Sequence, residues 1–125
     1  MPHAHSSCLE GLRVAVVEDE SLIAMTVEET LLDAGVHVVG IAGTVAQAIE
    51  LVERERPHAV TLDGNLRGQI SGPVAARLDE LGIRYLVVTG YVELTLADPH
   101  LSKAPRLNKP FTAGTLVAAA EKHLC

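Results

Sequence analysis

The sequence predicts an α/β domain built as a doubly wound parallel sheet with helices on both faces. Short apolar runs of strand length alternate along the chain with stretches that show helical periodicity. This alternation is typical of parallel sheets, because two neighbouring parallel strands are joined by a crossover that usually contains a helix. The five apolar runs are Val14–Val17, Val36–Ile41, Ala59–Leu62, Tyr85–Val88 and Arg106–Asn108.

The first helix is expected over residues 21–34, directly after the first apolar run. Ile23, Val27 and Leu31 share one helical face, so this face should pack on the sheet. The acidic residues between them then face water. Gly35 follows the last periodic residue and ends the helix.

The second helix should begin after Thr44. Thr44 and Gln47 have the spacing of a capping box, in which the two side chains accept hydrogen bonds from backbone N–H groups that the helix leaves unpaired. Arg56 precedes Pro57, and a residue before proline is disfavoured in the helical region. The helix should therefore end at this pair.

Two further helices have clear start signals. Gly72 and Pro73 begin one of them, since proline fits the first turn, where its missing N–H costs nothing. Gly82 ends that helix. Thr112 is a suitable N-cap for a last helix that runs to about His123.

The stretch between Thr89 and Lys109 should contain the remaining helix. Pro99 and Pro105 interrupt it, because proline lacks an N–H and its ring clashes with the preceding turn. β-Branched residues lower its helix propensity further. We therefore expect about five helices, of which this fourth one is short or irregular.

Composition and charge exclude several function classes. Hydrophobic residues make up 48% of the chain and aromatic residues only 2%, so the core should be aliphatic. The net charge of −6 argues against nucleic acid as the main partner, since nucleic-acid binders carry a basic patch or stripe. No apolar run approaches the roughly 18 residues of a membrane span, and the first nine residues lack the features of a signal peptide. We expect neither a nucleic-acid nor a membrane partner.

The two cysteines lie near opposite ends of the chain. Cys8 and Cys125 are too few for a disulfide framework, so the simpler interpretation is a reduced protein in the cytoplasm. The polar residues 1–10 are interpreted as a flexible lead-in, and residues 11–125 as one domain of ordinary size.

Four of the five apolar runs end on residues that phosphoryl chemistry needs. Glu18 and Asp19 follow the first run, and Asp63 follows the third. Thr89 follows the fourth run and Lys109 the fifth. The carboxyl ends of parallel strands meet at one edge of an open sheet, where ligands bind, so these side chains should converge. The second run ends in Gly-Thr without a charged group and should lie off the site.

Any one of these residues alone would suit a turn, a helix cap or the surface. The complete set, in this order, resembles the receiver domain of bacterial two-component response regulators over about residues 11–124. The resemblance implies a flavodoxin-like fold with strand order 2-1-3-4-5. It also implies that Asp63 is the phosphoacceptor, that Lys109 pairs with Asp63 and then with the phosphoryl group, and that the Thr89 hydroxyl moves towards that group.

The same resemblance implies a Mg²⁺ site. Asp19 and Asp63 would be direct ligands, Glu18 would act through water, and Asn65 would contribute its backbone carbonyl. The chemistry agrees, because three clustered carboxylates repel one another and Mg²⁺ prefers carboxylates, waters and phosphate oxygens.

Two details concern the subfamily. Thr89-Gly90-Tyr91 and the stretch 65–68 resemble the FAT GUY receivers, which are often single-domain proteins of alphaproteobacterial signalling, although Val87-Val88 replaces the Phe-Ala of that pattern. Many receivers also carry an aromatic residue three positions before the lysine, whereas this chain has Arg106. Tyr91 or Arg106 is therefore the candidate for signal relay.

The resulting hypothesis is a stand-alone receiver in a cytoplasmic phosphorelay, a monomer or weak homodimer. It would take its phosphoryl group from a histidine kinase or a histidine phosphotransfer protein, and would act as a switch on an unknown protein partner or as a phosphate sink. It would catalyse only its own phosphorylation and dephosphorylation. Two alternatives remain open: a binding module that does not use phosphate, and a small phosphatase with an Asp nucleophile. Asn65 weighs against the phosphatase, since such enzymes commonly carry a second acid there.

Overall fold

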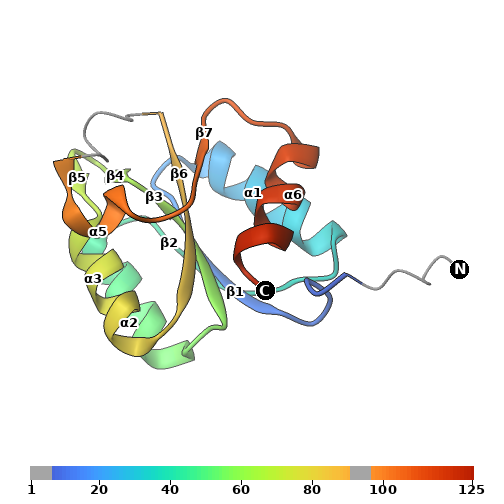
Figure 1. Cartoon of the computed structure of the whole chain (residues 1–125), viewed down its shortest axis with the longest axis horizontal. Coiled ribbons are helices and arrows are strands. Elements are labelled where there is room, and N and C mark those ends of the chain that lie inside the picture. Colours follow the sequence, from blue (N-terminus) through green and yellow to red (C-terminus); the bar gives the residue numbers. More distant parts are fainter. Residues whose placement is uncertain (1–6, 91–96) are drawn as a thin grey trace, which may run out of the picture.

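The computed structural model describes residues 7–90 and 97–125. Five parallel strands form one sheet in the order β2-β1-β3-β6-β7 (Figure 1). The order among these strands is the predicted 2-1-3-4-5, with β3 in the centre and β2 and β7 at the edges. The strands are β1 Arg13–Val17, β2 His37–Ala42, β3 Ala59–Asp63, β6 Arg84–Thr89 and β7 Arg106–Asn108.

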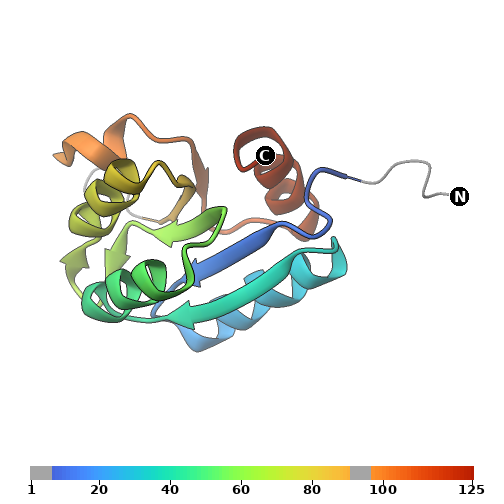
Figure 2. The same ribbon diagram turned by 90° about the horizontal axis from the view of Figure 1, so that it is seen from below.

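Helices cover both faces of the sheet, as the sequence predicts. One face is covered by α1 and α6, which pack against each other, and the other by α2, α3 and α5 (Figures 1 and 2). None of the helices in the described parts of the chain is long and apolar enough to cross a membrane. The helices are α1 Ser21–Asp33, α2 Val45–Glu55, α3 Gly72–Leu81, α5 Pro99–Ser102 and α6 Ala113–His123.

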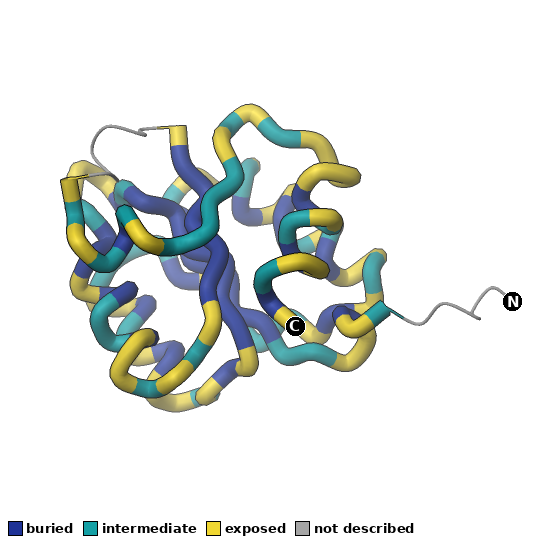
Figure 3. Tube along the Cα trace, in the orientation of Figure 1, coloured by how far each residue is buried: buried dark blue, intermediate teal, exposed yellow. Residues whose placement is uncertain are grey.

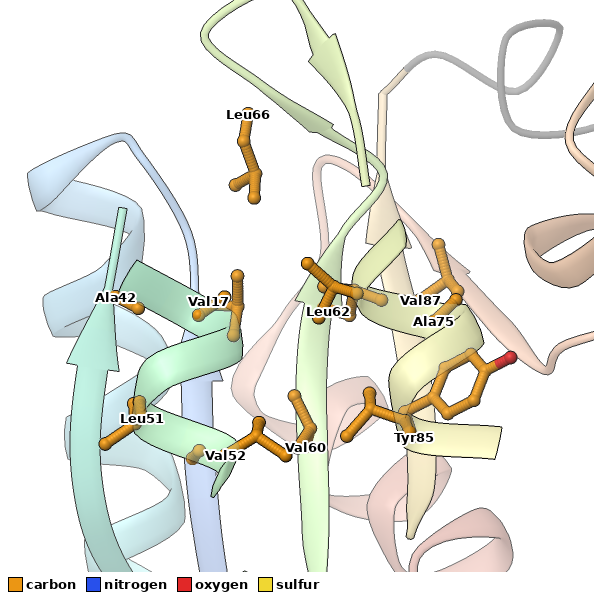
Figure 4. Close-up of a cluster of buried hydrophobic side chains, with 14 of the residues drawn as sticks. Val17, Ala42, Leu51, Val52, Val60, Leu62, Leu66, Ala75, Tyr85 and Val87 are labelled. Carbon is orange, nitrogen blue, oxygen red and sulfur yellow. The ribbon is translucent and has the colours of Figure 1, made fainter. Parts of the chain in front are cut away.

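The sheet divides the core into two aliphatic clusters. Successive side chains of a strand point to opposite faces, so Ala15 and Val17 of β1 join the cluster under α2 and α3, while Val14 and Val16 join the cluster under α1 and α6. Figure 4 shows the first cluster, in which Tyr85 is the aromatic member. The three inner strands β1, β3 and β6 are largely buried, and the outer faces of the helices are exposed (Figure 3).

The predicted helix caps are present, with one difference. The Thr44 hydroxyl accepts from the backbone N–H of Gln47 at 3.1 Å, but the Gln47 side chain accepts from Gly43 at 3.2 Å and not from Thr44. The Gln47 side chain therefore bonds to the residue before the N-cap instead of to the N-cap itself. At the start of α6, Thr112 and Thr115 form a complete reciprocal capping box.

The helix between Thr89 and Lys109 is short, as expected, in the part that the structure describes. It is α5, which has four residues and follows the N-cap Asp98. The Asp98 carboxylate accepts from the backbone N–H groups of His100 at 2.8 Å and Leu101 at 3.0 Å. Leu101 is fully buried, and the imidazole of His100 lies 2.9 Å from the Asp79 carboxylate of α3. Burial, the cap and the contact with α3 therefore anchor this helix.

A small hairpin follows β3 that the sequence analysis does not predict. Strands β4 (Asn65–Leu66) and β5 (Gln69–Ile70) pair antiparallel across a two-residue turn. The turn residues Arg67 and Gly68 have φ values of 53° and 84°. Positive φ at both central positions is the geometry that matches the twist of a tight hairpin.

The prediction that the cysteines are reduced is wrong in this structure, because Cys8 and Cys125 form a disulfide. Distance along the chain is a poor guide here, since the segment before β1 lies beside the last turn of α6. Leu9 and Leu124 are buried in the same core cluster and bring the two segments together. Residues 8 and 9 of the expected lead-in thus contact the domain.

The close contact between Gly72 at the start of α3 and Asp98, the N-cap of α5, predicts that Gly72→Ala strongly destabilises the protein. A Cβ at this position would overlap the Asp98 carboxylate that caps α5. We expect Gly72→Ala to lower the free energy of unfolding by about 1–3 kcal/mol in urea denaturation. The control is Gly114→Ala in the first turn of α6, where a Cβ would meet nothing closer than 3.8 Å. Equal stability of the two variants would contradict the proposed packing.

Candidate phosphoryl-transfer site

Residues with polar side chains lie at the carboxyl ends of four strands, where a crevice opens at the edge of the sheet. Asp63 and Thr89 are the last residues of β3 and β6, and Glu18 directly follows β1. Lys109 directly follows β7. A pocket of about 400 Å³ opens here, and Asp19, Asp63 and Lys109 line it. No residue of β2 lines this pocket, in agreement with the sequence prediction.

The crevice gathers three carboxylates. Oxygen atoms of Glu18, Asp19 and Asp63 all lie within 4.8 Å of one another. Glu18 and Asp63 are buried, with 5% and 4% of their surface exposed, whereas Asp19 is half-buried. Charges of one sign at this distance repel, so the cluster needs positive charge or protons.

Lys109 supplies positive charge to the two buried carboxylates. Its ammonium lies 2.9 Å from Oε1 of Glu18 and 3.1 Å from Oδ2 of Asp63. Burial lowers the pKa of Lys109, but its hydrogen bonds and charge interactions with these two acids outweigh burial and raise the pKa overall. The ammonium therefore stays charged at neutral pH.

The single positive charge of Lys109 does not balance three carboxylates, and the pKa of Glu18 reflects this imbalance. Burial, followed by its hydrogen bond with Asp63, raises the pKa of Glu18 to about 8, although Lys109 opposes the rise. Without a further cation, the raised pKa of Glu18 favours protonation of this carboxylate near neutral pH. The same arrangement leaves the site prepared to exchange this proton for a metal ion, since metal ligands must be deprotonated.

The donor set fits a hard divalent cation. It consists of the clustered carboxylate oxygens. Asn65 lies beside them, and its backbone N–H donates to Oδ1 of Asp63 at 3.0 Å. The side-chain Oδ1 of Asn65 is buried and has no hydrogen-bond partner within the described residues. A buried acceptor without a donor calls for a bound cation or water nearby. Oxygen ligands of this kind are those that Mg²⁺ prefers.

Sequence reasoning missed the role of Arg67. Its backbone N–H donates to Oδ2 of Asp19 at 3.1 Å, so the β4–β5 hairpin fixes the most exposed of the three carboxylates. Arg67 also lines the pocket. The signal in the sequence is the Arg67-Gly68 pair, because a glycine in a short polar loop after a strand is typical of a tight turn.

A protein-family model, that of the response regulator receiver domain, matches residues 14–121. The chain belongs to the response regulator receiver family. This membership agrees with the fold and with the crevice, since both were expected from the resemblance in the sequence.

Three similar proteins illustrate the range of the receiver family. The chain is 31% identical to the transcriptional regulatory protein PdtaR of Mycobacterium tuberculosis over 112 residues, which are 87% of this chain and 55% of PdtaR. The receiver domain of PhyR from Erythrobacter litoralis superposes with a TM-score of 0.80 at 27% identity, covering 90% of this chain and 89% of the domain. SdrG from Sphingomonas melonis superposes with a TM-score of 0.73 at 37% identity, covering 87% of this chain and 95% of SdrG. The chain thus spans about half the length of PdtaR.

In this receiver, Thr89 and Lys109 are held in register by the backbone. Thr89 is fully buried, and its carbonyl accepts from the N–H of Lys109 at 2.9 Å. The neighbouring strand pairs in parallel, with Thr89 opposite Asn108. The two residues expected to contact a phosphoryl group therefore cannot shift independently along their strands.

Of the two candidates for signal relay, Tyr91 and Arg106, the structure describes only Arg106. Tyr91 lies outside the described residues. Arg106 extends from β7 towards α5, where its Nη2 donates to the carbonyl of Ser102 at 3.1 Å. Its Nη1 is buried and has no partner among the residues that the structure describes. Arg106 therefore connects the strand before Lys109 with the short helix.

The repulsion among the carboxylates predicts that Asp19→Asn stabilises the protein without divalent cations. Asparagine keeps an acceptor for the N–H of Arg67 and removes one charge from the cluster. We expect the free energy of unfolding to rise by about 1–4 kcal/mol, the range for two charges roughly 4 Å apart between bulk water and a protein surface. Added Mg²⁺ should cancel the difference, because a ligand that binds the folded state stabilises the parent more.

Glu29→Gln is the matched control for Asp19→Asn. It removes the same charge from the exposed side of α1 and should leave stability unchanged. Urea denaturation with and without Mg²⁺ measures all three proteins. If Asp19→Asn were no more stable than the control, repulsion would not dominate the cluster.

Proposed function

We propose that this receiver is a phosphorylation-controlled switch whose phosphoacceptor is Asp63. The observation that carries the proposal is the position of the Asp63 carboxylate. It is buried at the end of the central strand, it pairs with Lys109, and it lies beside two further carboxylates that fit a divalent cation. The donor would be a phosphohistidine of a histidine kinase or of a histidine phosphotransfer protein.

The chemistry needs little covalent work from the protein. An oxygen of Asp63 forms a bond to phosphorus while the P–N bond of the phosphohistidine breaks, which yields an aspartyl phosphate and a free histidine. Catalysis of such transfers is mostly positioning and stabilisation of charge. Lys109 is positioned to exchange its pairing with Asp63 for a phosphoryl oxygen.

The residues that would hold Mg²⁺ are Asp19 and Asp63 as direct ligands, Glu18 through water and the backbone carbonyl of Asn65. The bound ion would supply neutralisation of the charge on the phosphoryl oxygens. The unpartnered Oδ1 of Asn65 and the raised pKa of Glu18 support this assignment, because both indicate that the crevice lacks positive charge.

Phosphorylation would be read through Thr89 and Lys109. Driving a two-state element from about 1:99 to 99:1 requires roughly 5.5 kcal/mol of differential interaction. A charge-assisted hydrogen bond contributes roughly 1.5–3 kcal/mol, so both residues are needed for a complete shift. Arg106, and Tyr91 in the undescribed stretch, are the proposed relays from this pair to α5.

The output would come from binding another protein or from removing phosphate from a competing regulator. Residues 11–125 would form the receiver and residues 1–10 a lead-in. SdrG, of which the chain covers 95%, supports a stand-alone receiver, and the similar anti-anti-sigma factor PhyR of Bartonella quintana supports a protein partner. We propose that this receiver acts in the cytoplasm as a monomer or weak homodimer and is not a turnover enzyme.

The direct test is phosphorylation in vitro. Incubation with Mg²⁺ and a small phosphodonor such as acetyl phosphate should add one phosphoryl group by intact-protein mass spectrometry. The label should be lost in base and hydroxylamine, because an acyl phosphate is labile to both. Asp63→Asn should remain unlabelled, while Asp33→Asn on exposed α1 should be labelled like the parent.

Label that resists base, or that persists in Asp63→Asn, would place the nucleophile elsewhere. Absence of label in the folded parent would favour the phosphate-independent module. Steady turnover of small phosphomonoesters would favour the phosphatase.

The switch itself is tested by hydrogen exchange over residues 89–106. A beryllofluoride complex, which mimics the phosphoryl group, should change protection there in the parent. Thr89→Ala should respond to less than half the parent's extent, whereas Thr89→Ser, which keeps the hydroxyl, should respond like the parent. An unchanged pattern in the parent, or a full response in Thr89→Ala, would mean that the signal leaves by another surface.

A further inference from the structure

The structure contains a covalent link far from the phosphoryl-transfer crevice. Cys8 and Cys125 are 117 residues apart in sequence and form a disulfide with a Cα–Cα distance of 5.9 Å. Cys125 lines a pocket with Leu12, His58 and Arg84, which lie where β1, β3 and β6 begin. The link is therefore at the amino edge of the sheet, opposite Asp63, and the proposed phosphoryl chemistry does not use it.

The two segments are held together without the sulfur atoms. Leu9 follows Cys8 and is fully buried, and Leu124 precedes Cys125 and is 2% exposed. Both leucines belong to the cluster under α1 and α6. The hydroxyl of Ser7 also donates to the carboxylate of Glu121 at 2.8 Å. These contacts would keep two thiols near each other after reduction.

The cysteines themselves are accessible. Both residues are exposed, in contrast to the leucines beside them. An exposed disulfide can be attacked by small thiols, and exposed disulfides are among the labile and regulatory ones. The combination of exposed cysteines and buried anchors favours a bond that opens and closes while the domain stays folded.

We propose that Cys8 and Cys125 form a reversible redox site that fastens the last turn of α6 to the segment before β1. In the opening reaction, a thiolate of a small monothiol or dithiol attacks one sulfur of the disulfide. The S–S bond of the protein breaks, one cysteine leaves as a thiolate, and the other forms a mixed disulfide with the small thiol. A second small thiolate then breaks this mixed disulfide. The protein gains two electrons and two protons as two thiols, and the reductant becomes a disulfide. A small-molecule disulfide drives the reverse reaction.

The effect on the protein follows from the size of the closed loop. A link that spans nearly the whole described domain removes many conformations from the unfolded chain. Reduction should therefore lower Tm by roughly 5 to 15 °C without unfolding the domain at 25 °C. It should also speed amide exchange at residues 7–10 and in the last turn of α6, since only non-covalent anchors remain there.

The experiment is a redox titration of the full chain in mixtures of reduced and oxidised glutathione. At each ratio, alkylation of free thiols followed by mass spectrometry counts the thiols on the monomer. We expect two thiols at the reducing end and none at the oxidising end, with a single transition that is the same from both directions. Thermal unfolding of the two end states gives the change in Tm.

Cys8→Ser and Cys125→Ser are matched variants that keep size and polarity. Each should have the Tm of the reduced parent, and neither should respond to reductant. Four results would overturn the proposal: two alkylated thiols at every ratio, a disulfide between two molecules, a disulfide without effect on Tm, or a reduced protein that is unfolded at 25 °C. The Ser variants help to interpret an unfolded reduced protein. If Cys8→Ser is folded at 25 °C, the disulfide is not needed for folding.

Discussion

The pairing of Lys109 with Glu18 and Asp63 is the interaction on which the crevice depends. Two carboxylates are buried at the carboxyl edge of the sheet, and this ammonium is the positive charge that lies within bonding distance of both. Breaking a buried ion pair by removing one partner typically costs about 3–5 kcal/mol, because the remaining charge stays buried. The sheet topology serves the same pairing, since β1, β3 and β7 must all end at the same edge of the sheet for it to form. The half-buried Asp19 follows Glu18 in the chain, and the backbone N–H of Arg67 in the hairpin after β3 holds its carboxylate.

Much of the fold could be predicted because its signals are local. The apolar runs identify all five strands of the main sheet, and Thr44, Gly82 and Thr112 mark helix ends where the structure has them. The prolines correctly indicate that α5 is short. The order of the strands came from the family resemblance, since periodicity says which residues form strands and not which strands are neighbours.

The site could be predicted in part, and its limits are physical. Glu18, Asp19, Asp63 and Lys109 were expected to converge because parallel strands end at one edge, and the structure brings them together. The backbone bond from Arg67 to Asp19 could not be read from the pattern, because it depends on a turn geometry. The disulfide was missed for a related reason. Two buried leucines, and not cysteine spacing, decide that the ends of the described chain meet.

The positions of β3 and β7 in the sheet have a consequence for the stability of different parts of the domain. All five residues of β3 are buried, and a strand pairs with it on each side. Strand β7 has three residues, lies at the edge and has no fully buried residue. Local opening free energies range from nearly zero up to the value for global unfolding, and few buried contacts place a segment at the low end. Asp63 therefore belongs to the last part of the molecule to open, and β7 to a part that can open by itself. When this edge strand opens, Lys109 moves with it, while the central strand keeps the backbone around the proposed acceptor Asp63 in place.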